Sequence, residues 1–443
     1  MPDTPLTSAK PTAVPLRPSA CPGLWRIVSA RDGGICRVKL PGGVLLADQA
    51  EALATAAERF ASGVIEATNR GNLQIRGIGS DHAALIDSLL DAGLGPRDAA
   101  SDDVRNLMLS PLAGHDPAML LDVRPLAGQI LDLLQGTPRF HQLSAKFAVQ
   151  LDGGEGVAML EHPHDLWLSP LQLDHCDWLA FGLASSPADG QVLGAVPLAQ
   201  GLALVRAVLE RFLDLASAEQ SRMRQLLHAG TAQAFIAGLG LPLRRDAAVL
   251  GWRRAAANRP WLGVVEQQHG LALGVAPPLG RLSPGMLRGV AKVARQWGDG
   301  SLRLSPWQSL MLTNIETAGL QPARAELSAL GLLCQADEPL ARLVACTGSQ
   351  GCAKGLADTK ADAVQLAAVL GGGAPGSVHL SGCSRSCAVA HVAAATLLAR
   401  APGRYDLYLR DARLSGFGAL RATDLTLNEA GAMLALPTEH LDD

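Results

Sequence analysis

Four cysteines in two widely separated pairs are the residues of this sequence best suited to chemistry. Cys346 and Cys352 have five residues between them, and Cys383 and Cys387 have three. Four thiolates are the usual ligand set of a [4Fe–4S] cluster. Structural zinc sites favour pairs with two to four intervening residues, and the first pair lies outside that range. The spacing therefore favours a [4Fe–4S] cluster over a zinc ion, four free buried thiols or a disulfide.

The residues around the cysteines fit a cluster site. Gly348, Gly351 and Gly382 allow tight turns and let backbone N–H groups approach sulfur. We expect a helix over Asp362 to Leu370 and a short strand over Ser377 to Leu380, so each pair would sit in a loop at the end of an element. The remaining cysteines have no paired spacing and are interpreted as small apolar residues: Cys21, Cys36, Cys176 and Cys334.

Composition indicates a globular chain of two to four domains. It has 443 residues, 48% of them hydrophobic and 18% charged, with a net charge of −3 and no long Lys/Arg run, which argues against a nucleic-acid partner. No apolar stretch reaches the roughly 18 residues of a membrane helix. Residues 1–19 lack the apolar core of a secretory signal and are predicted to be a disordered arm. We therefore expect a cytoplasmic, reducing location, where cysteines are metal ligands or plain thiols.

One plan occurs twice in the chain, at an offset of about 236 residues. An apolar-periodic helix is predicted over Ala47 to Phe60, and a similar one over Pro284 to Trp297. Ser110 lies 236 residues before Cys346. Each predicted helix is followed by two strands with period-two alternation: Val64–Thr68 with Leu73–Arg76, and Leu302–Ser305 with Leu310–Leu312.

A nearly constant offset indicates duplication, with chance similarity in an Ala/Leu/Gly-rich chain as the alternative. We expect each half to contain a β-α-β-β unit followed by a larger α/β unit. A helical stretch over Leu198 to Ile236 and a hinge over Leu239 to Arg245 would separate the halves. The first half has Ser110 and Lys146-Phe147 where the second has cysteines. The second half is therefore expected to bind the metal and the first to contact the substrate.

These motifs together resemble the nitrite and sulfite reductase superfamily. The two cysteine pairs, the second within Ser381–Cys387, resemble its cluster signature, and Thr68–Arg76 resembles its T-x-R-x-N-x-Q-x-R strand pair. Val104–Asn106 with Ser110–Leu112 resembles its second arginine motif, and Lys146-Phe147 its lysine motif. The resemblance extends over about residues 20 to 415.

This resemblance implies an α+β fold of two ferredoxin-like half-domains and two larger α/β units related by pseudo-two-fold symmetry. In the superfamily a sirohaem lies between the halves, and the cysteine matching Cys387 bridges the cluster and the haem iron. The predicted divisions of the chain are 1–19 for the arm, 20–98 and 239–325 for the ferredoxin-like halves, 99–238 for the first α/β unit and 326–443 for the cluster-bearing unit.

Within the superfamily the sequence is most similar to the precorrin-3B synthases. Cys21–Trp25, Asp32–Gly34 and Arg37-Val38 resemble their amino-terminal pattern, and Cys346–Thr359 and His379–Cys383 resemble their cluster region. The resemblance implies a monooxygenase of aerobic cobalamin biosynthesis. Such an enzyme uses O2 and NADH to hydroxylate the tetrapyrrole precorrin-3A and to form a γ-lactone on it.

One departure favours this branch over the reductases. Reductases carry a second lysine two residues after the first, where this chain has Ala148. Loss of a fixed cation weakens a pocket for a small dianion, but matters less when a macrocycle is the substrate. The alternatives are a sirohaem-dependent assimilatory sulfite or nitrite reductase, and a non-enzymatic cluster-bearing tetrapyrrole carrier.

The resemblance places several polar side chains around one cleft. Guanidinium groups pair bidentately with carboxylates, which the proposed substrate carries in number. For Arg70 and Arg76 the alternative is a solvated strand face, and for the amides it is turn capping. Arg385 could tune the cluster or face water. The expected substrate contacts are Arg70, Arg76, Arg105, Lys146, Asn72, Gln74 and Asn106.

Two further short runs carry weaker signals. His162 and His164, within Glu161–Asp165, could supply a mononuclear non-haem iron with two His and a carboxylate, but a polar loop is the favoured interpretation. Gly371–Gly376 fits G-x-G-x-x-G, but a helix precedes it and a strand follows, the reverse of a dinucleotide site. NADH electrons are therefore expected to arrive through a separate reductase. His141, His379 and His391 stay unassigned.

Overall fold

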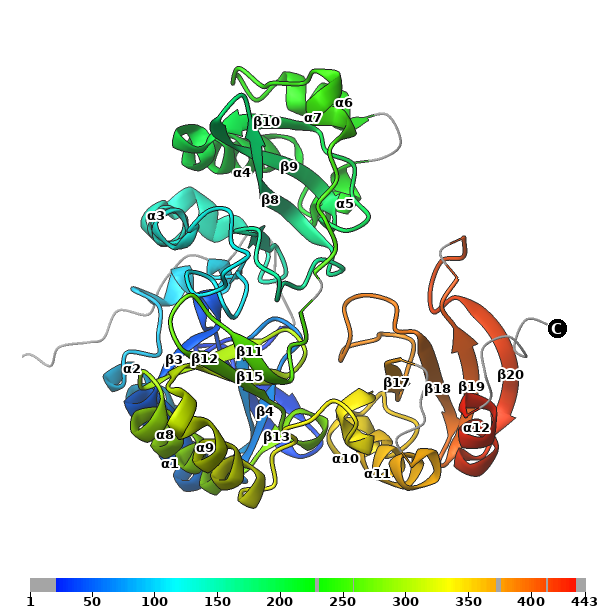
Figure 1. Cartoon of the computed structure of the whole chain (residues 1–443). Coiled ribbons are helices and arrows are strands. Elements are labelled where there is room, and N and C mark those ends of the chain that lie inside the picture. The colour runs from blue at the N-terminus through cyan, green and yellow to red at the C-terminus, as the bar shows by residue number, and fades with distance from the viewer. Residues whose placement is uncertain (1–20, 228–230, 258, 372–375, 412, 436–443) are drawn as a thin grey trace, which may run out of the picture.

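The computed structural model describes residues 21–227, 231–257, 259–371, 376–411 and 413–435. The predicted arm over 1–19 and most of the glycine-rich run, 372–375, lie outside these ranges. Four five-stranded sheets form the described part of the chain (Figure 1). Two are antiparallel with strands of up to seven residues, and we call them the small sheets. Two are mixed with strands of up to ten residues, and we call them the larger sheets. This combination agrees with the expected α+β class.

The two small sheets have the same strand order. The first runs β1 (Val28–Ala30), β2 (Gly33–Val38), β5 (Leu73–Ile78), β4 (Val64–Ala67), β13 (Arg281–Leu282). The second runs β11 (Gly263–Glu266), β12 (Leu271–Val275), β15 (Ser309–Ile315), β14 (Ser301–Ser305), β3 (Val44–Leu46). The helices of this part are α1 (Ala47–Phe60), α2 (His82–Asp91), α8 (Pro284–Trp297) and α9 (Thr317–Ala329).

The larger sheets also match each other strand for strand. One runs β6 (Leu107–Met108), β7 (Val149–Leu151), β8 (His164–Leu173), β9 (Cys176–Ser185), β10 (Gly194–Pro197). The other runs β16 (Leu343–Ala345), β17 (Val378–Ser381), β18 (Ala395–Ala401), β19 (Arg404–Leu409), β20 (Ala419–Leu425). In both, the first three strands are parallel and the last two antiparallel. This equivalence supports the duplication inferred from the sequence.

Helices cover the larger sheets. The first unit has α3 (Arg124–Gly136), α4 (Gly201–Leu215), α5 (Met223–Leu226), α6 (Thr231–Ala237) and α7 (Ala247–Gly251). The second has α10 (Gly348–Gly351), α11 (Thr359–Leu370) and α12 (Leu427–Leu434). Short 3-10 helices span Pro41–Gly43, Ala99–Val104, Pro138–Gln142, Leu198–Gln200, Pro278–Gly280 and Pro339–Arg342. None of the described helices is long and apolar enough to cross a membrane.

The predicted elements form where local signals agree. The helices expected over Ala47–Phe60 and Pro284–Trp297 are confirmed as α1 and α8. The start of α8 is fixed by Ser283, whose side chain accepts from the Met286 N–H, and by a proline at the first helical position. The proposed hinge segment is attached to the first larger sheet, where Arg244 bridges to Ala195 of β10.

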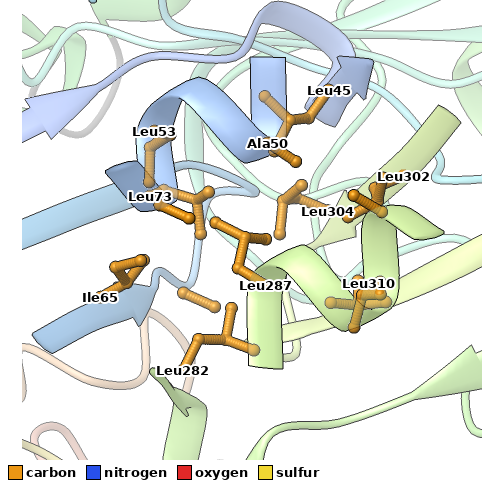
Figure 2. Packing of buried hydrophobic residues seen from close by; sticks show 14 of the residues in the cluster. Leu45, Ala50, Leu53, Ile65, Leu73, Leu282, Leu287, Leu302, Leu304 and Leu310 are labelled. Atoms are coloured by element: carbon orange, nitrogen blue, oxygen red, sulfur yellow. The ribbon is translucent and has the colours of Figure 1, made fainter. Parts of the chain in front are cut away.

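The two small sheets exchange their edge strands. β13, from the second half of the chain, pairs with β4 of the first, and β3 pairs with β14 of the second. Helices α1 and α8 also pack together, so both halves share one apolar core (Figure 2). Leu53, Leu73, Leu287 and Leu310 meet in it from both halves. The two small sheets and their helices therefore form a single packed unit with one core, to which the two larger units are attached.

Two neighbouring leucines of β3 test this shared core. Leu45 is fully buried, whereas Leu46 faces solvent. Leu45→Ala removes apolar contacts across both halves and should lower the free energy of unfolding by about 2–5 kcal/mol. Leu46→Ala, the matched control, should change it by less than about 0.5 kcal/mol. Chemical denaturation measures both, and equal losses would contradict the shared core.

Candidate functional site

The four paired cysteines gather at one edge of the second larger sheet. Cys346 follows β16 and Cys383 follows β17, and these strands are adjacent and parallel. Their carboxyl ends therefore meet at the same edge, where α10 brings Cys352 and the loop after β17 brings Cys387. All four side chains line one cavity of about 650 Å³. The prediction that distant loops would bring these cysteines together agrees with this placement.

The four cysteine sulfur atoms are close enough to interact electrostatically. Solvent reaches Cys387, but the surrounding walls raise the pKa of its thiol, and the negative charges of Cys383, Cys346 and Cys352 raise it further. The Gly382 N–H donates to Cys346 Sγ at 3.2 Å. Thiolates repel one another unless a cation lies between them, so this donor set fits a cluster of iron ions.

Glycine is required in these loops. Gly348 has φ of 68°, in the left-handed region, and a Cβ there would lie 2.7 Å from the Ala357 carbonyl oxygen. A Cβ on Gly382 would lie 3.2 Å from Gly355 Cα, which is a tight contact, and 3.5 Å from Cys346 Sγ. The glycines singled out in the sequence therefore give the backbone its close approach to the cysteines.

A buried carboxylate beneath the first cysteine loop links three parts of the chain. Glu66 of β4 accepts from Thr347 Oγ1 at 3.1 Å and from Arg281 Nε of β13 at 3.0 Å. Lys360 Nζ and Arg76 Nη1 lie 3.8 and 3.6 Å from its oxygens. Burial raises the pKa of Glu66, but the charges of Lys360, Arg76 and Arg281 outweigh it and hold that pKa below its usual value.

Lys360 supports the same loop from below. Its Nζ donates to the carbonyl oxygens of Leu279 at 2.6 Å and Ala345 at 3.2 Å, next to Cys346. Burial lowers the pKa of Lys360 to about 8, even though Glu66 opposes the shift. Neither Glu66 nor Lys360 was identified from the sequence. The only signal is a charged residue within the apolar run of β4.

Arg76 holds the cysteine loop against the first small sheet. It binds Asp32 bidentately at 2.8 and 3.0 Å and donates to the Gly351 carbonyl at 3.3 Å. It still lines the cavity, together with Gln74. In the amide orientation that satisfies both groups, the Gln74 oxygen accepts from Arg37 Nε and Nη2 at 3.2 and 2.7 Å.

Three predicted substrate contacts bond to the backbone, and none of them is among the residues lining the cysteine cavity. Arg105 is buried and donates to the carbonyls of Gly95 and Lys39. Asn106 Nδ2 donates to three backbone carbonyls within 3.0 Å. Asn72 Oδ1 accepts from the Leu40 N–H at 2.8 Å. Arg105 Nε has no hydrogen-bond partner among the described residues, and a substrate role for these three residues stays a prediction.

Two other predicted contacts are not part of the cysteine cavity wall. Lys146 is exposed, and neither it nor Arg70 is among the residues lining the cysteine cavity. Burial lowers the pKa of Arg70 to about 10, and the positive charge of Arg222 lowers it further while Asp165 opposes the shift. Cations that the sequence did not identify line the cavity instead: Arg31, Arg37, Lys354 and Lys360, along with Arg385.

The histidine run does not form the iron site considered for it. Asp165 is bound by Arg222 Nε at 2.9 Å and by the Met223 N–H, and His164 Nδ1 lies 2.8 Å from the His162 carbonyl oxygen. The Asp165 carboxylate is therefore not free to bind a metal ion together with the two imidazoles. Across the described ranges, no group of three or more His, Cys, Asp or Glu side chains is arranged to hold a single metal ion, and this holds for the four paired cysteines too, whose sulfurs only a larger multi-iron cluster would join.

A second cavity adjoins the first. It measures about 390 Å³ and shares Asn69, Gln308 and Ala388 with the cysteine cavity. His162 and His391, with ring centroids 5.1 Å apart, lie in its wall with the stacked pair Trp261 and Trp307. Burial lowers the pKa of His162, so a neutral imidazole faces this space. Most of the other lining is apolar.

Comparison with known proteins gives two family matches. The nitrite/sulfite reductase ferredoxin-like half domain matches residues 29–93 and 264–330. The nitrite and sulphite reductase 4Fe-4S domain matches residues 100–246. The matched 4Fe-4S segment is the first larger unit, which lacks the paired cysteines, and the second is its structural duplicate.

Individual relatives are oxidoreductases of two kinds. Ferredoxin–nitrite reductase of Zea mays is 32% identical, over 81% of this chain and 68% of its own length. Precorrin-3B synthase of a Sinorhizobium species is 29% identical, over 92% of this chain and 86% of its own. The solved structure of Mycobacterium tuberculosis NirA has the same fold, with 24% identity, a TM-score of 0.75 and coverage of 90% and 79%. These relatives support an iron–sulfur cofactor.

Loss of one cysteine tests the proposed ligand set. Cys383→Ala should abolish the broad iron–sulfur absorption near roughly 400 nm and lower bound iron and sulfide, because three thiolates hold the cluster poorly. Cys176→Ala, at an exposed position in the first larger unit, is the matched control and should retain both. Full iron and sulfide content in the Cys383 variant would contradict the assignment.

Proposed function

This chain belongs to the nitrite and sulfite reductase family, and we propose that within it the chain is a precorrin-3B synthase. The proposed reaction is the hydroxylation of precorrin-3A by O2, with electrons from NADH, followed by γ-lactone formation from an acetate side chain. The electrons would arrive through a separate reductase protein. The observation that carries this proposal is the length over which the chain matches each kind of relative.

The match to the synthase is more complete than the match to the reductases. The Sinorhizobium synthase aligns over 92% of this chain and 86% of itself. The nitrite reductases of Zea mays and Synechococcus elongatus align over 81% of this chain and over 68% and 75% of themselves, at 32% identity. Identity is thus similar, and the larger aligned share of this chain favours the synthase.

The cysteine cavity suits a large polyanion. Its volume of about 650 Å³ lies in the range of sites for drug-sized or larger ligands. Lys354 and Arg385 are exposed at its wall beside the cysteines, and Arg31 donates to the Ser349 carbonyl there. Such spread-out cations can pair with the peripheral carboxylates of a tetrapyrrole and orient one ring carbon.

The position that holds a second lysine in the reductases supports the same proposal. Ala148 is buried, and its N–H donates to Asp165 Oδ2 at 2.9 Å. Lys146 is exposed and is absent from the residues lining the cavity. A concentrated cationic pocket for a small dianion therefore lacks two of its expected contributors.

In this proposal Cys346, Cys352, Cys383 and Cys387 hold a [4Fe–4S] cluster, which when bound supplies single electrons. The chain's own side chains position the cysteine loops and bind the substrate. Glu66 and Arg76 fix the first cysteine loop against the small sheets. The cations of the cavity wall would hold the carboxylates of the substrate. The described residues suggest no ligand set for a mononuclear non-haem iron.

A sirohaem-dependent nitrite or sulfite reductase is the second candidate. It is favoured by the 32% identity to the nitrite reductases and by the position of Cys387, whose exposed side chain lines the cavity beside the other three cysteines. A sulfur in that place could bridge a cluster to a haem iron. The absorption spectrum of protein purified anaerobically separates the candidates, because sirohaem adds a Soret band that a cluster lacks.

Substrate conversion tests the synthase directly. Protein with an intact cluster, incubated with precorrin-3A and then given O2 and a chemical reductant, should yield a product heavier by one oxygen atom and carrying a lactone, detected by mass spectrometry. Unchanged precorrin-3A would reject the synthase. Reduction of nitrite or sulfite by the same preparation would then establish the second candidate.

The cavity cations give a variant test. The double change Lys354→Gln with Arg385→Gln should weaken precorrin-3A binding by about tenfold or more, because two charge-assisted contacts are lost. Lys292→Gln, which removes an exposed cation from α8, is the control and should bind normally. Equal affinity of both variants, measured by fluorescence titration, would remove these cations from the substrate site.

A further inference from the structure

The pseudo-two-fold symmetry gives the Glu66–Lys360 junction a counterpart in the first half. Lys360 is in the first turn of α11, and Arg124, 236 residues earlier, starts the equivalent helix α3. Glu66 in β4 corresponds to Arg303 in β14, 237 residues later. An ion pair in one half is therefore replaced by two arginines in the other.

The counterpart also lacks an apolar side chain. In the second half Leu279 is buried in the core with Leu343 and Ala345. In the matching 3-10 helix of the first half, 237 residues earlier, the equivalent position is Gly42, whose φ of 70° corresponds to the 52° of Leu279. Where the leucine would lie, the first half has a cavity of about 240 Å³. It is lined by Pro41, Gly42, Val44, Leu107, Leu109, Ser110, Ala113, Arg124, Ala127, Gly128, Leu131 and Arg303.

One cation in this cavity is incompletely compensated. Arg303 Nε is buried and has no hydrogen-bond partner among the described residues. Its Nη2 lies 3.3 Å from His115 Nε2. Burial lowers the pKa of Arg303, Asp299 opposes this, and the charge of Arg124 lowers it further. Arg124 itself is already paired bidentately with Asp122 at 2.9 and 2.8 Å.

The histidine beside Arg303 does not supply a compensating charge. Burial lowers the pKa of His115, and Arg303 and Arg124 lower it further, so its imidazole is neutral near pH 7. Arg303 Nε is shielded from solvent, but the guanidinium as a whole lines the cavity and forms no ion pair with a described residue, so an anion in the cavity would recover electrostatic free energy. The rest of the wall is largely aliphatic, from Leu107, Leu109, Leu131 and Ala127.

We propose that this cavity binds a small organic monocarboxylate. Its carboxylate would accept from Arg303 and Arg124, and its apolar body would lie against the leucines of β6, its following loop and α3. A single negative charge suits the site because Arg124 is already neutralised by Asp122. The aliphatic wall disfavours a fully hydrated anion such as phosphate. The site lies in the half without the cluster and is independent of the proposed precorrin chemistry.

Binding of benzoate to the full-length holoprotein tests the proposal, with isothermal titration calorimetry as the readout. Benzoate should bind at one site, the neutral isostere benzamide should bind at least tenfold more weakly, and inorganic phosphate should not compete. No benzoate binding, equal affinity for benzamide, or displacement by phosphate would each overturn the proposal.

Two variants place the binding in this cavity. Arg303→Met should weaken benzoate binding at least tenfold, whereas Lys292→Met, an exposed cation elsewhere, should not. Gly128 lines the cavity and a Cβ there would meet nothing within 4 Å, so Gly128→Leu has room to place its side chain at the cavity without a clash. Replacing a glycine inside a helix also favours folding, so this variant should raise Tm while abolishing binding. Unchanged benzoate affinity in Gly128→Leu would overturn the proposal even if Arg303→Met failed to fold.

Discussion

The position of the first cysteine loop depends on one buried carboxylate. Glu66 meets Arg281 from the other half of the chain, Thr347 from the loop itself, and the ammonium of Lys360 beneath it. A buried carboxylate is stable only when cations and donors surround it, so these groups must converge when the protein folds. That requirement joins the small sheets to the cysteine-bearing unit and fixes one wall of the cavity.

Duplication gave the molecule two equivalent frames, and side-chain changes made them different. Both larger units present the carboxyl ends of parallel strands to the small sheets, yet Cys346 stands at one edge and Ser110 at the other. Ser110 Oγ donates to the Val157 carbonyl at 2.6 Å, so that position is part of the packing of the first unit. The four paired cysteines are all in one half, while the shared core keeps the other half in place.

The sequence predicts the fold more completely than the site. Local signals, such as the Ser283 cap and the alternation in β4 and β5, determined elements that the structure confirms. The convergence of the cysteines followed from their spacing and type. The donation of Arg105 to the Gly95 carbonyl and the acceptance by Asn72 from the Leu40 N–H were not foreseen, because a one-dimensional pattern does not show which backbone groups a side chain will meet. Lys360 was missed because nothing local marks a lysine as buried.

The exchange of edge strands has a consequence for synthesis of the chain. The amino-terminal sheet is completed only by β13, and β3 completes a sheet whose other strands begin at Gly263. While the ribosome is still making the middle of the chain, the early strands therefore wait with an open edge. Contacts so distant in sequence are slow to form, and an unfilled edge invites pairing with other chains. Nascent protein should thus depend on chaperones until translation has passed residue 305, where β14 ends.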